Sequence, residues 1–306
     1  MAPLTAYRRT GADPPFGDPR RAHGTRFEGY YWRITDAAAG RVAIALCGVC
    51  RDAAGPWAIV ALASEPGGLV RSRIEPLAEV AWDGLGVTAG DAFAGSADGL
   101  RVDLGTDARL ELRFGERQEW PVRAFGGTGP AQLVPGLPQY WHPHLLGACV
   151  TGSGWDGATA YAEKNWGPAF TEHWWWGQAQ GFPGADACVA FAGGRVSLGP
   201  VGGAPTAVVV RLEDRVLRLA PPFARLTSAV GAAGWRVRAR SVRWAVELEG
   251  EAVGAPAVLP VPVQEERRVV DRSQQHLAGR LRVTLRRGRR VVFAGESVVA
   301  GLERWV

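Results

Sequence analysis

Short runs of alternating apolar and polar residues, separated by clusters of Gly, Pro and Asp, recur along this chain of 306 residues. The clearest case is residues 100–114, where two alternating runs flank the turn segment Gly105–Asp107. Because side chains of a β-strand point to opposite faces in turn, this pattern predicts an antiparallel hairpin with one buried face. The 41 Gly and 21 Pro residues favour many short strands joined by turns over long helices.

Similar patterns extend over most of the chain. Apolar runs at 41–50 and 57–64 flank a turn cluster and predict a buried hairpin. Further strands are expected at 27–34, 187–191, 207–212, 215–219 and 236–248, and a hairpin at 280–293. In the run 236–248, the inward-facing residues would include Val242 and Trp244. The polar stretch 264–275 is the one candidate for a helix of three turns, and it suits an excursion between strands equally well.

Roughly fifteen or more short strands of this kind should close into barrels or sandwiches, because closure removes exposed strand edges. The segment 1–24 differs, since its prolines at positions 14, 15 and 19 predict an extended lead-in. Residues 117–139 lose the alternation and gather Gly and Pro. We expect a long loop there, either a lid or a crossing between two halves.

The chain is basic, with a formal net charge of +5 and a pI near 9.4. Its arginines are spread over the alternating runs rather than gathered in one block, which argues against a nucleic-acid partner. Of its 35 basic residues only Lys164 is a lysine. The N-terminal segment has no apolar core of the signal-peptide type, and no run of about 18 apolar residues occurs, so we expect no transmembrane segment and a cytoplasmic location.

The residues that could hold a metal or a cofactor are scattered. Cys47 and Cys50 form a lone CxxC inside an apolar run, and His142 and His144 stand apart from any carboxylate cluster. A zinc site needs a fuller ligand set, so we expect no metal. The segment 126–129 is Gly-rich but is followed by Pro rather than by a helix, which excludes a phosphate-binding loop. No cofactor is predicted.

The stretch Tyr161–Gln180 joins a compact charged segment to three consecutive tryptophans. A strand beginning near residue 172 would place Trp174, Trp176 and Gln178 on one face and Trp175 on the other. Aromatic side chains suit core strands, so a packed Trp-rich strand is one interpretation. Three adjacent indoles are large, and their N–H groups need partners, which favours the alternative, the wall of a ligand cavity.

Two motifs resemble those of the tocopherol cyclase family. The string EKNWG, residues Glu163–Gly167, is followed by the aromatic triplet and then by Gln178, as in that family. Nearer the N-terminus, RFEGYYW at Arg26–Trp32 is similar to the family's FEGWY element. The two motifs occur in the family's order and the resemblance spans most of the chain. The last third of the chain matches only in its pattern of short strands and turns.

This resemblance implies an all-β fold of two consecutive lipocalin-like, calycin-type antiparallel β-barrel or sandwich halves. We expect an N-terminal lead-in at 1–24, a first half at 25–152 and a second half at 153–306. The EKNWG and Trp-triplet segment would then lie at the interface of the halves, where a pocket is expected.

The resemblance also implies a reaction, the cyclisation of a prenylated quinol. An acid protonates the alkene of the prenyl chain, a tertiary cation forms, and the phenolic oxygen closes the ring. The acid must be neutral near pH 7, which burial can achieve, and the cation needs aromatic faces. Candidate catalytic acids are Glu163, Glu28 and Asp156. Candidate substrate-binding residues are Lys164, Asn165, Trp166, Trp174, Trp176, Gln178, Tyr31 and His142.

Other interpretations remain open. Glu163 could belong to a structural ion pair, and Glu28 could pair with Arg26 or Arg33 on an edge strand. A non-catalytic lipocalin-like carrier of a prenylquinone or carotenoid needs the same cavity but no acid. Another carbocation enzyme, such as a terpenoid cyclase or hydratase, needs both the cavity and an acid. In each case the partner is a small apolar or prenylated ligand, with transient membrane contact during its uptake. The sequence carries no signal for an oligomeric state.

Overall fold

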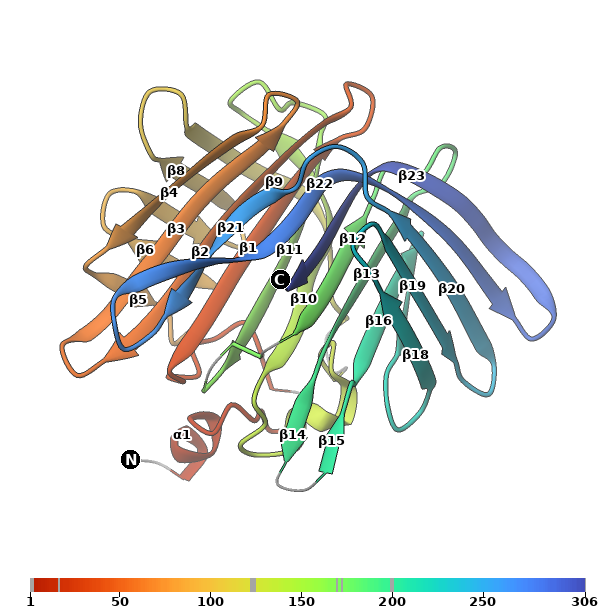
Figure 1. Ribbon diagram of the computed structural model, residues 1–306, viewed down its shortest axis with the longest axis horizontal. Helices are drawn as coiled ribbons and strands as arrows, with labels where there is room; N and C mark the ends of the chain where they lie inside the picture. The colour runs from red at the N-terminus through yellow and green to blue at the C-terminus, as the bar shows by residue number, and fades with distance from the viewer. Residues whose placement is uncertain are drawn as a thin grey trace.

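The computed structural model describes residues 3–15, 17–121, 125–168, 170–171, 173–198 and 201–305. In this part of the chain, nearly all regular structure is antiparallel β-sheet. Two large sheets each curl around a core of their own and lie side by side (Figure 1). The predicted fold class, two consecutive lipocalin-like β-barrel halves, is therefore confirmed.

The first sheet has eleven strands in the order β4-β3-β2-β1-β11-β10-β9-β8-β7-β6-β5. Their bounds are β1 (Phe27–Asp36), β2 (Arg41–Asp52), β3 (Gly55–Glu65), β4 (Leu69–Glu75), β5 (Ala78–Val80), β6 (Gly86–Ala89), β7 (Phe93–Ser96), β8 (Gly99–Asp103), β9 (Arg109–Glu119), β10 (Tyr140–Thr151) and β11 (Thr159–Gly167). Strand β1 is central, because β2 pairs with one of its edges and β11 with the other.

The second sheet has the order β17-β16-β13-β12-β23-β22-β20-β19-β18, and β21 also pairs with β22. Its strands are β12 (Trp174–Ala179), β13 (Ala187–Gly194), β16 (Thr206–Leu212), β17 (Arg215–Leu219), β18 (Arg225–Val230), β19 (Gly234–Arg240), β20 (Trp244–Glu251), β21 (Ala257–Val263), β22 (Arg268–Arg287) and β23 (Arg290–Trp305). A separate hairpin joins β14 (Val196–Leu198) to β15 (Val201–Gly203).

Strand alternation divides the apolar side chains among three main cores. In β1, Tyr30 and Trp32 face the core of the first barrel, whereas Tyr31 faces a core shared by the two barrels. In β12, Trp176 belongs to this shared core, and Trp175 packs against the core of the second barrel. The period-2 pattern of each strand thus fixes which residues meet at the interface.

Strand β11, which carries the EKNWG motif, belongs to the first sheet. It pairs with β1 along one edge and β10 along the other, so its backbone groups are satisfied by the first barrel. The chain passes to the second sheet between Gly167 and Trp174, not at residue 152 as predicted. The physical reason is that β10 and β11 form one hairpin, whose turn at residues 152–158 resembles a linker in sequence.

The N-terminal lead-in is not wholly extended. Helix α1 (Pro3–Arg8) precedes the prolines on which that prediction rested. It packs near the 3₁₀-helix η1 (Gly129–Leu133), where the Tyr7 hydroxyl donates a 2.6 Å hydrogen bond to the Leu133 carbonyl. This tertiary contact, which no local pattern reveals, stabilises a helix of six residues.

One further expectation about strands was wrong, and the structure decides between the two alternatives for the stretch 264–275. The run 236–248 is two strands, β19 and β20, and Val242 is fully exposed in the turn between them. The stretch 264–275 is not a helix, since β22 begins within it at Arg268. No helix in the described ranges is both long and apolar enough to span a bilayer.

Candidate functional site

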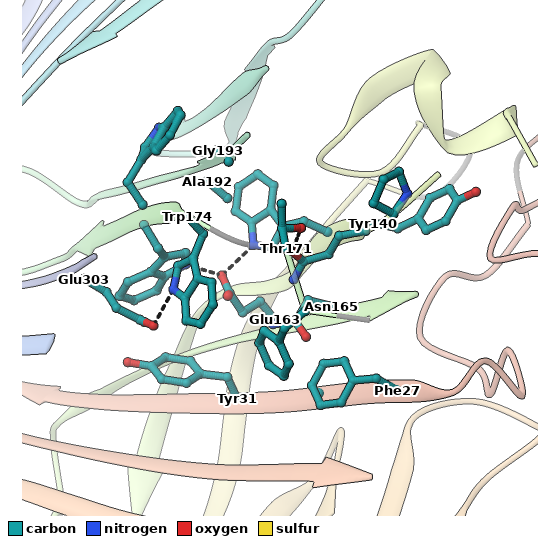
Figure 2. A pocket seen from close by; sticks show the side chains of 18 of the residues that line it. Phe27, Tyr31, Tyr140, Glu163, Asn165, Thr171, Trp174, Ala192, Gly193 and Glu303 are labelled. Atoms are coloured by element: carbon teal, nitrogen blue, oxygen red, sulfur yellow. Dashed lines mark hydrogen bonds between the residues drawn. The ribbon is translucent and has the colours of Figure 1, made fainter. Parts of the chain in front are cut away.

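A cavity of about 360 Å³ lies between the two barrels. Its walls come from strands of both sheets, among them β1, β2, β10 and β11 of the first and β12, β13, β21 and β23 of the second, together with loops, and they are mostly aromatic and aliphatic. Among the side chains that line it are Tyr31, Trp141, Glu163, Asn165, Trp174 and Trp176 (Figure 2). An aromatic-lined cavity beside the EKNWG strand, as the sequence suggested, is therefore present.

Glu163 is the buried carboxyl of this cavity, with 4% of its surface exposed. Its Oε2 accepts hydrogen bonds from Trp141 Nε1 at 2.8 Å, from Trp176 Nε1 at 2.9 Å and from the Tyr161 hydroxyl at 2.5 Å. Burial raises the pKa of Glu163 to about 7, although these three donors act in the opposite direction. A substantial fraction of this carboxyl is therefore neutral at physiological pH.

The two oxygens of Glu163 differ in their surroundings. All three hydrogen bonds end on Oε2, and within the described residues none engages Oε1. A carboxylic acid whose Oε2 accepts three bonds carries its proton on Oε1. Because Glu163 lines the cavity, this proton is available to a molecule bound there.

Glu28, the second predicted acid, has the opposite character. It is completely buried but forms ion pairs with Lys164 Nζ at 2.7 Å and Arg51 Nη2 at 2.9 Å. The backbone N–H groups of His23 and Gly24 also donate to it. Despite its burial, the two cations and these donors lower the pKa of Glu28 to about 2. An ionised carboxylate that does not line the cavity cannot supply the proton, so this assignment was wrong.

Lys164 points away from the cavity, because it is adjacent to Glu163 on a β-strand. It is fully buried, pairs with Glu28 and donates to the Arg21 carbonyl at 2.6 Å. It therefore joins the N-terminal segment to the barrel rather than binding substrate, in contrast to the sequence-based assignment. The same geometry keeps Lys164 from pairing with Glu163, so the alternative that Glu163 forms a structural ion pair with this lysine is excluded.

Asp156, the third predicted acid, is exposed in the turn between β10 and β11. Its carboxylate accepts the backbone N–H of Gly152 at 3.1 Å and stabilises that turn. It does not line the cavity. An exposed carboxyl outside the cavity cannot reach a molecule bound there, so the assignment of Asp156 as the acid was wrong.

Asn165 follows Glu163 on the same face of β11 and lines the cavity. Its side-chain oxygen is buried and has no hydrogen-bond partner in the described part of the chain. The amide lies against Gly29 of β1, where an added Cβ would be 2.4 Å from Asn165 Oδ1. The glycine of the FEGYYW element thus makes room for an amide oxygen that can accept a hydrogen bond from a ligand.

Three candidate substrate-binding residues, Trp174, Trp176 and Tyr31, also line the cavity. Trp176 contacts the Tyr31 ring edge-on, with ring centroids 5.2 Å apart. The indole N–H of Trp174 donates to Glu303 Oε1 at 2.8 Å. The two indoles thus act in two ways: their N–H groups donate hydrogen bonds to carboxyls, and their ring faces line the cavity.

Three other predicted ligands lie outside the cavity. Trp166 is fully buried, and its N–H donates to the Gly11 carbonyl at 2.7 Å. Gln178 accepts a hydrogen bond from the buried Arg33 guanidinium at 3.0 Å. His142 packs against Trp120, and burial lowers its pKa to about 3, so it is neutral. Each has the residue type expected of a binding group, but its strand position directs it into packed protein.

Glu303 on β23 is a cavity residue that the sequence did not reveal. Its Oε1 accepts hydrogen bonds from Trp174 Nε1 and, at 2.7 Å, from the Ser273 hydroxyl. Burial raises its pKa above the usual value for a glutamate. The only available signal was a lone acid near the end of an alternating run, which is typical of a solvated strand face.

Among the described residues, no cluster of three potential ligands could hold a metal ion.

Fold and site together define a class of protein: a two-barrel β-protein with an apolar, aromatic-lined cavity that contains a buried carboxyl. The family model described as tocopherol cyclase-like matches residues 152–304, half of the chain. The chain therefore belongs to the tocopherol cyclase-like family.

Two plant relatives support this membership. Over 166 residues the chain is 28% identical to the chloroplastic tocopherol cyclase of Zea mays, covering 47% of this chain and 35% of that protein. Over 151 residues it is 28% identical to a probable chloroplastic tocopherol cyclase of Oryza sativa subsp. japonica, covering 45% and 32% of the two chains. The match spans about a third of the length of these relatives.

Solved structures show the same fold at low sequence identity. Kievitone hydratase from Nectria haematococca has a TM-score of 0.52 at 12% identity, covering 91% of this chain and 88% of its own. CghA, solved with Sch210972, has a TM-score of 0.54 at 13% identity, covering 92% and 88%. The shared architecture thus extends over nearly the whole chain.

Proposed function

We propose that this protein is an acid-initiated cyclase and that its substrate is a prenylated quinol or a related isoprenoid. The observation that carries the proposal is Glu163, a carboxyl with a pKa near 7 on the wall of an aromatic cavity. Family membership and the names of the plant relatives agree with this chemistry. The neutral acid is the component that a simple carrier would not require.

In the proposed reaction, Glu163 donates its proton to one carbon of the prenyl double bond. A tertiary cation forms at the other carbon, and the neighbouring hydroxyl oxygen attacks it. The new C–H and C–O bonds replace the π bond and the O–H bond, so the product is an isomer of the substrate. No oxidant or cofactor enters this balance.

The surroundings of Glu163 suit both of its charge states. Burial favours the neutral acid before proton transfer, while the donors on Oε2 stabilise the carboxylate that transfer produces. The indole faces of Trp174 and Trp176 can each stabilise a nearby cation by about 0.5–2 kcal/mol. The apolar lining excludes water, which would otherwise capture the cation.

Asn165 is the group that we assign to the aromatic head of the substrate. Its unpartnered Oδ1 can accept a hydrogen bond from a quinol hydroxyl, at a position two residues along β11 from the acid. Such an anchor would present the prenyl chain to Glu163 and the indoles. A cavity of about 360 Å³ matches a head group with the reacting part of its chain.

A prenylated substrate partitions into lipid, so we propose transient contact of the protein with a membrane surface during uptake. A cytoplasmic location stays a prediction. Cosedimentation with vesicles of phosphatidylcholine and phosphatidylglycerol tests the contact. The expected result is weak binding that increases when the vesicles contain the prenylated quinol.

The direct test of the function is incubation with a prenylated benzoquinol in deuterated water. Wild-type protein should give a ring product that carries deuterium at the protonated carbon. Glu163→Gln should lower this rate by about 10²–10⁴-fold, the usual contribution of a general acid. Glu296→Gln is the matched control, because Glu296 pairs with Arg282 away from the cavity. Tight binding of the quinol without turnover would instead indicate a carrier.

A further inference from the structure

Glu303 is a second carboxyl on the wall of the same cavity, in the second sheet. Its Oε1 is held by the Trp174 indole and the Ser273 hydroxyl, at 2.8 and 2.7 Å. No hydrogen bond within the described ranges engages Oε2. Like Glu163, it therefore has one oxygen fixed by protein donors and one that is free to meet a ligand.

The two carboxyls reach the cavity from different barrels. Glu163 projects from β11 of the first sheet, and Glu303 projects from β23 of the second (Figure 2). Ring closure needs a donor that protonates the alkene carbon and an acceptor that takes the proton of the attacking hydroxyl. Two carboxyls on separate walls of one cavity can divide these roles, as paired carboxyls do in glycoside hydrolysis.

The donors around Glu303 suit an acceptor of protons. Burial raises the pKa of Glu303, but the Ser273 hydroxyl and the Trp174 indole N–H act in the opposite direction and stabilise the charged form of this carboxyl. No Arg or Lys is paired with Glu303 among the described ion pairs, so its negative charge is not neutralised by a permanent partner. Glu28, by contrast, is ion-paired with a lysine and an arginine.

We propose that Glu303 is a second catalytic carboxyl and that it accepts the proton of the attacking hydroxyl when the ring closes. This inference rests on the proposed cyclase function. As the C–O bond forms, the O–H bond breaks and its proton passes to the Glu303 carboxylate. Glu163 has meanwhile become a carboxylate by giving its proton to carbon. Exchange of protons with water after product release restores both groups.

Glu303→Gln separates this role from that of Glu163. In deuterated water with a prenylated benzoquinol, the variant should still form the cation, because Glu163 is intact. Ring closure should fall by about 10²-fold or more. The cation should instead lose a proton, so recovered substrate and its double-bond isomers should carry deuterium. Glu163→Gln should lose both exchange and ring closure, and Glu296→Gln should lose neither.

Ser273→Ala gives a second readout that keeps the carboxyl. Loss of one donor raises the pKa of Glu303, and an acceptor must be ionised, so the acidic limb of the pH–rate profile should move to higher pH. The inference is overturned if Glu303→Gln closes the ring at the wild-type rate. It is also overturned if deuterium exchange disappears together with ring closure while the quinol still binds. Wild-type protein that neither exchanges nor cyclises would remove the proposed function and this inference with it.

Discussion

Glu163 and Glu28 lie on neighbouring strands and are both buried, yet their pKa values are shifted in opposite directions. Glu163 is partly neutral near pH 7, whereas Glu28 is ionised. The side chain of Glu163 faces the cavity between the barrels, where it meets only neutral donors. The side chain of Glu28 faces the first barrel, where Lys164 and Arg51 pair with it. Strand alternation thus separates a carboxyl suited to proton transfer from one suited to structure.

The pH dependence of the wild-type reaction follows from the raised pKa of Glu163. A general acid must be protonated to act, so activity should decrease as the pH rises through about 7. A pH–rate profile for formation of the deuterated ring product measures this decrease, which is the alkaline limb of the profile. Activity that is constant between pH 6 and 9 would contradict the assignment of Glu163.

Trp176→Phe tests how the indole N–H affects the acid. The variant keeps an aromatic wall but removes one donor from Glu163 Oε2. Since that donor stabilises the carboxylate, its loss should raise the pKa of Glu163 further, and the alkaline limb should move to higher pH. Trp82→Phe, at an exposed tryptophan outside the cavity, should leave the profile unchanged. A downward movement of the limb in Trp176→Phe would contradict this account.

At the level of single residues, the sequence predicted part of the site. Glu163, a candidate acid, lines the cavity, whereas its neighbour Lys164, a candidate substrate-binding residue, points the other way because adjacent strand residues face opposite sides. Strand alternation could not predict that Glu28 is ionised, since Arg51 and the backbone of residues 23–24 reach it from other segments. Glu303 was missed for a similar reason, as its partners Ser273 and Trp174 lie on two different strands.

Strand β11 carries the EKNWG motif, whose residues alternate between a face that lines the cavity and a face with structural contacts. It lies inside the first sheet between β1 and β10, so both of its edges are paired. One face supplies Glu163 and Asn165 to the cavity, and the other supplies Lys164 and Trp166 to the first barrel and the N-terminal segment. A substitution on either face should therefore have a distinct effect.

Lys164→Met should act on stability. It leaves Glu28 buried with one partner fewer, and breaking a buried pair in this way typically costs about 3–5 kcal/mol. Denaturant unfolding at pH 7 measures the loss. The deficit should shrink toward pH 2, where Glu28 becomes protonated in the wild type. Arg71→Gln, which breaks an exposed pair with Asp107, should cost less than about 1 kcal/mol. A similar cost for the two variants would contradict the structural role of Lys164.

The errors at the element scale share one cause. The boundary at residue 152, helix α1 and the turn at Val242 each depend on which distant segment a strand or helix contacts. Alternation and turn composition do not record such contacts. The strand 215–219, whose ends are defined by its own sequence, was predicted with its observed bounds.

Across the whole molecule, the two barrels are joined by the shared apolar core and by buried hydrogen bonds, among them those of the Arg33 guanidinium. Arg33 of β1 donates to the Leu277 carbonyl at 2.8 Å, to the Val299 carbonyl and to Gln178. These acceptors belong to β22, β23 and β12 of the second sheet. No carboxylate pairs with Arg33 among the ion pairs of the described residues; carbonyl, amide and Thr35 hydroxyl oxygens accept from its terminal nitrogens, and its Nε has no partner in this part of the chain.

Arg33→Met should weaken the junction of the barrels. It leaves two carbonyls and the Gln178 oxygen without their donor, at about 1–3 kcal/mol for each buried group that finds no substitute. We expect a loss of at least about 3 kcal/mol in denaturant unfolding. A loss within about 1 kcal/mol would show that the hydrogen bonds of Arg33 do not contribute to the junction of the barrels.

The sequence predicted the architecture of the whole molecule better than its site. Alternating runs and turn clusters indicated closed β-structure, and the two family motifs indicated paired barrels with a cavity between them. The position of each side chain relative to that cavity depends on how two sheets from distant parts of the chain pack. Trp166, Gln178 and His142 were misplaced for that reason.

The central claim is that the cavity holds Glu163 as a largely neutral acid near pH 7. Infrared difference spectra of wild-type protein minus Glu163→Gln, recorded across pH, isolate the C=O stretch of this protonated carboxyl. The account predicts that this band disappears with a midpoint near pH 7. A midpoint near 4.5, the ordinary value for a glutamate, would contradict it.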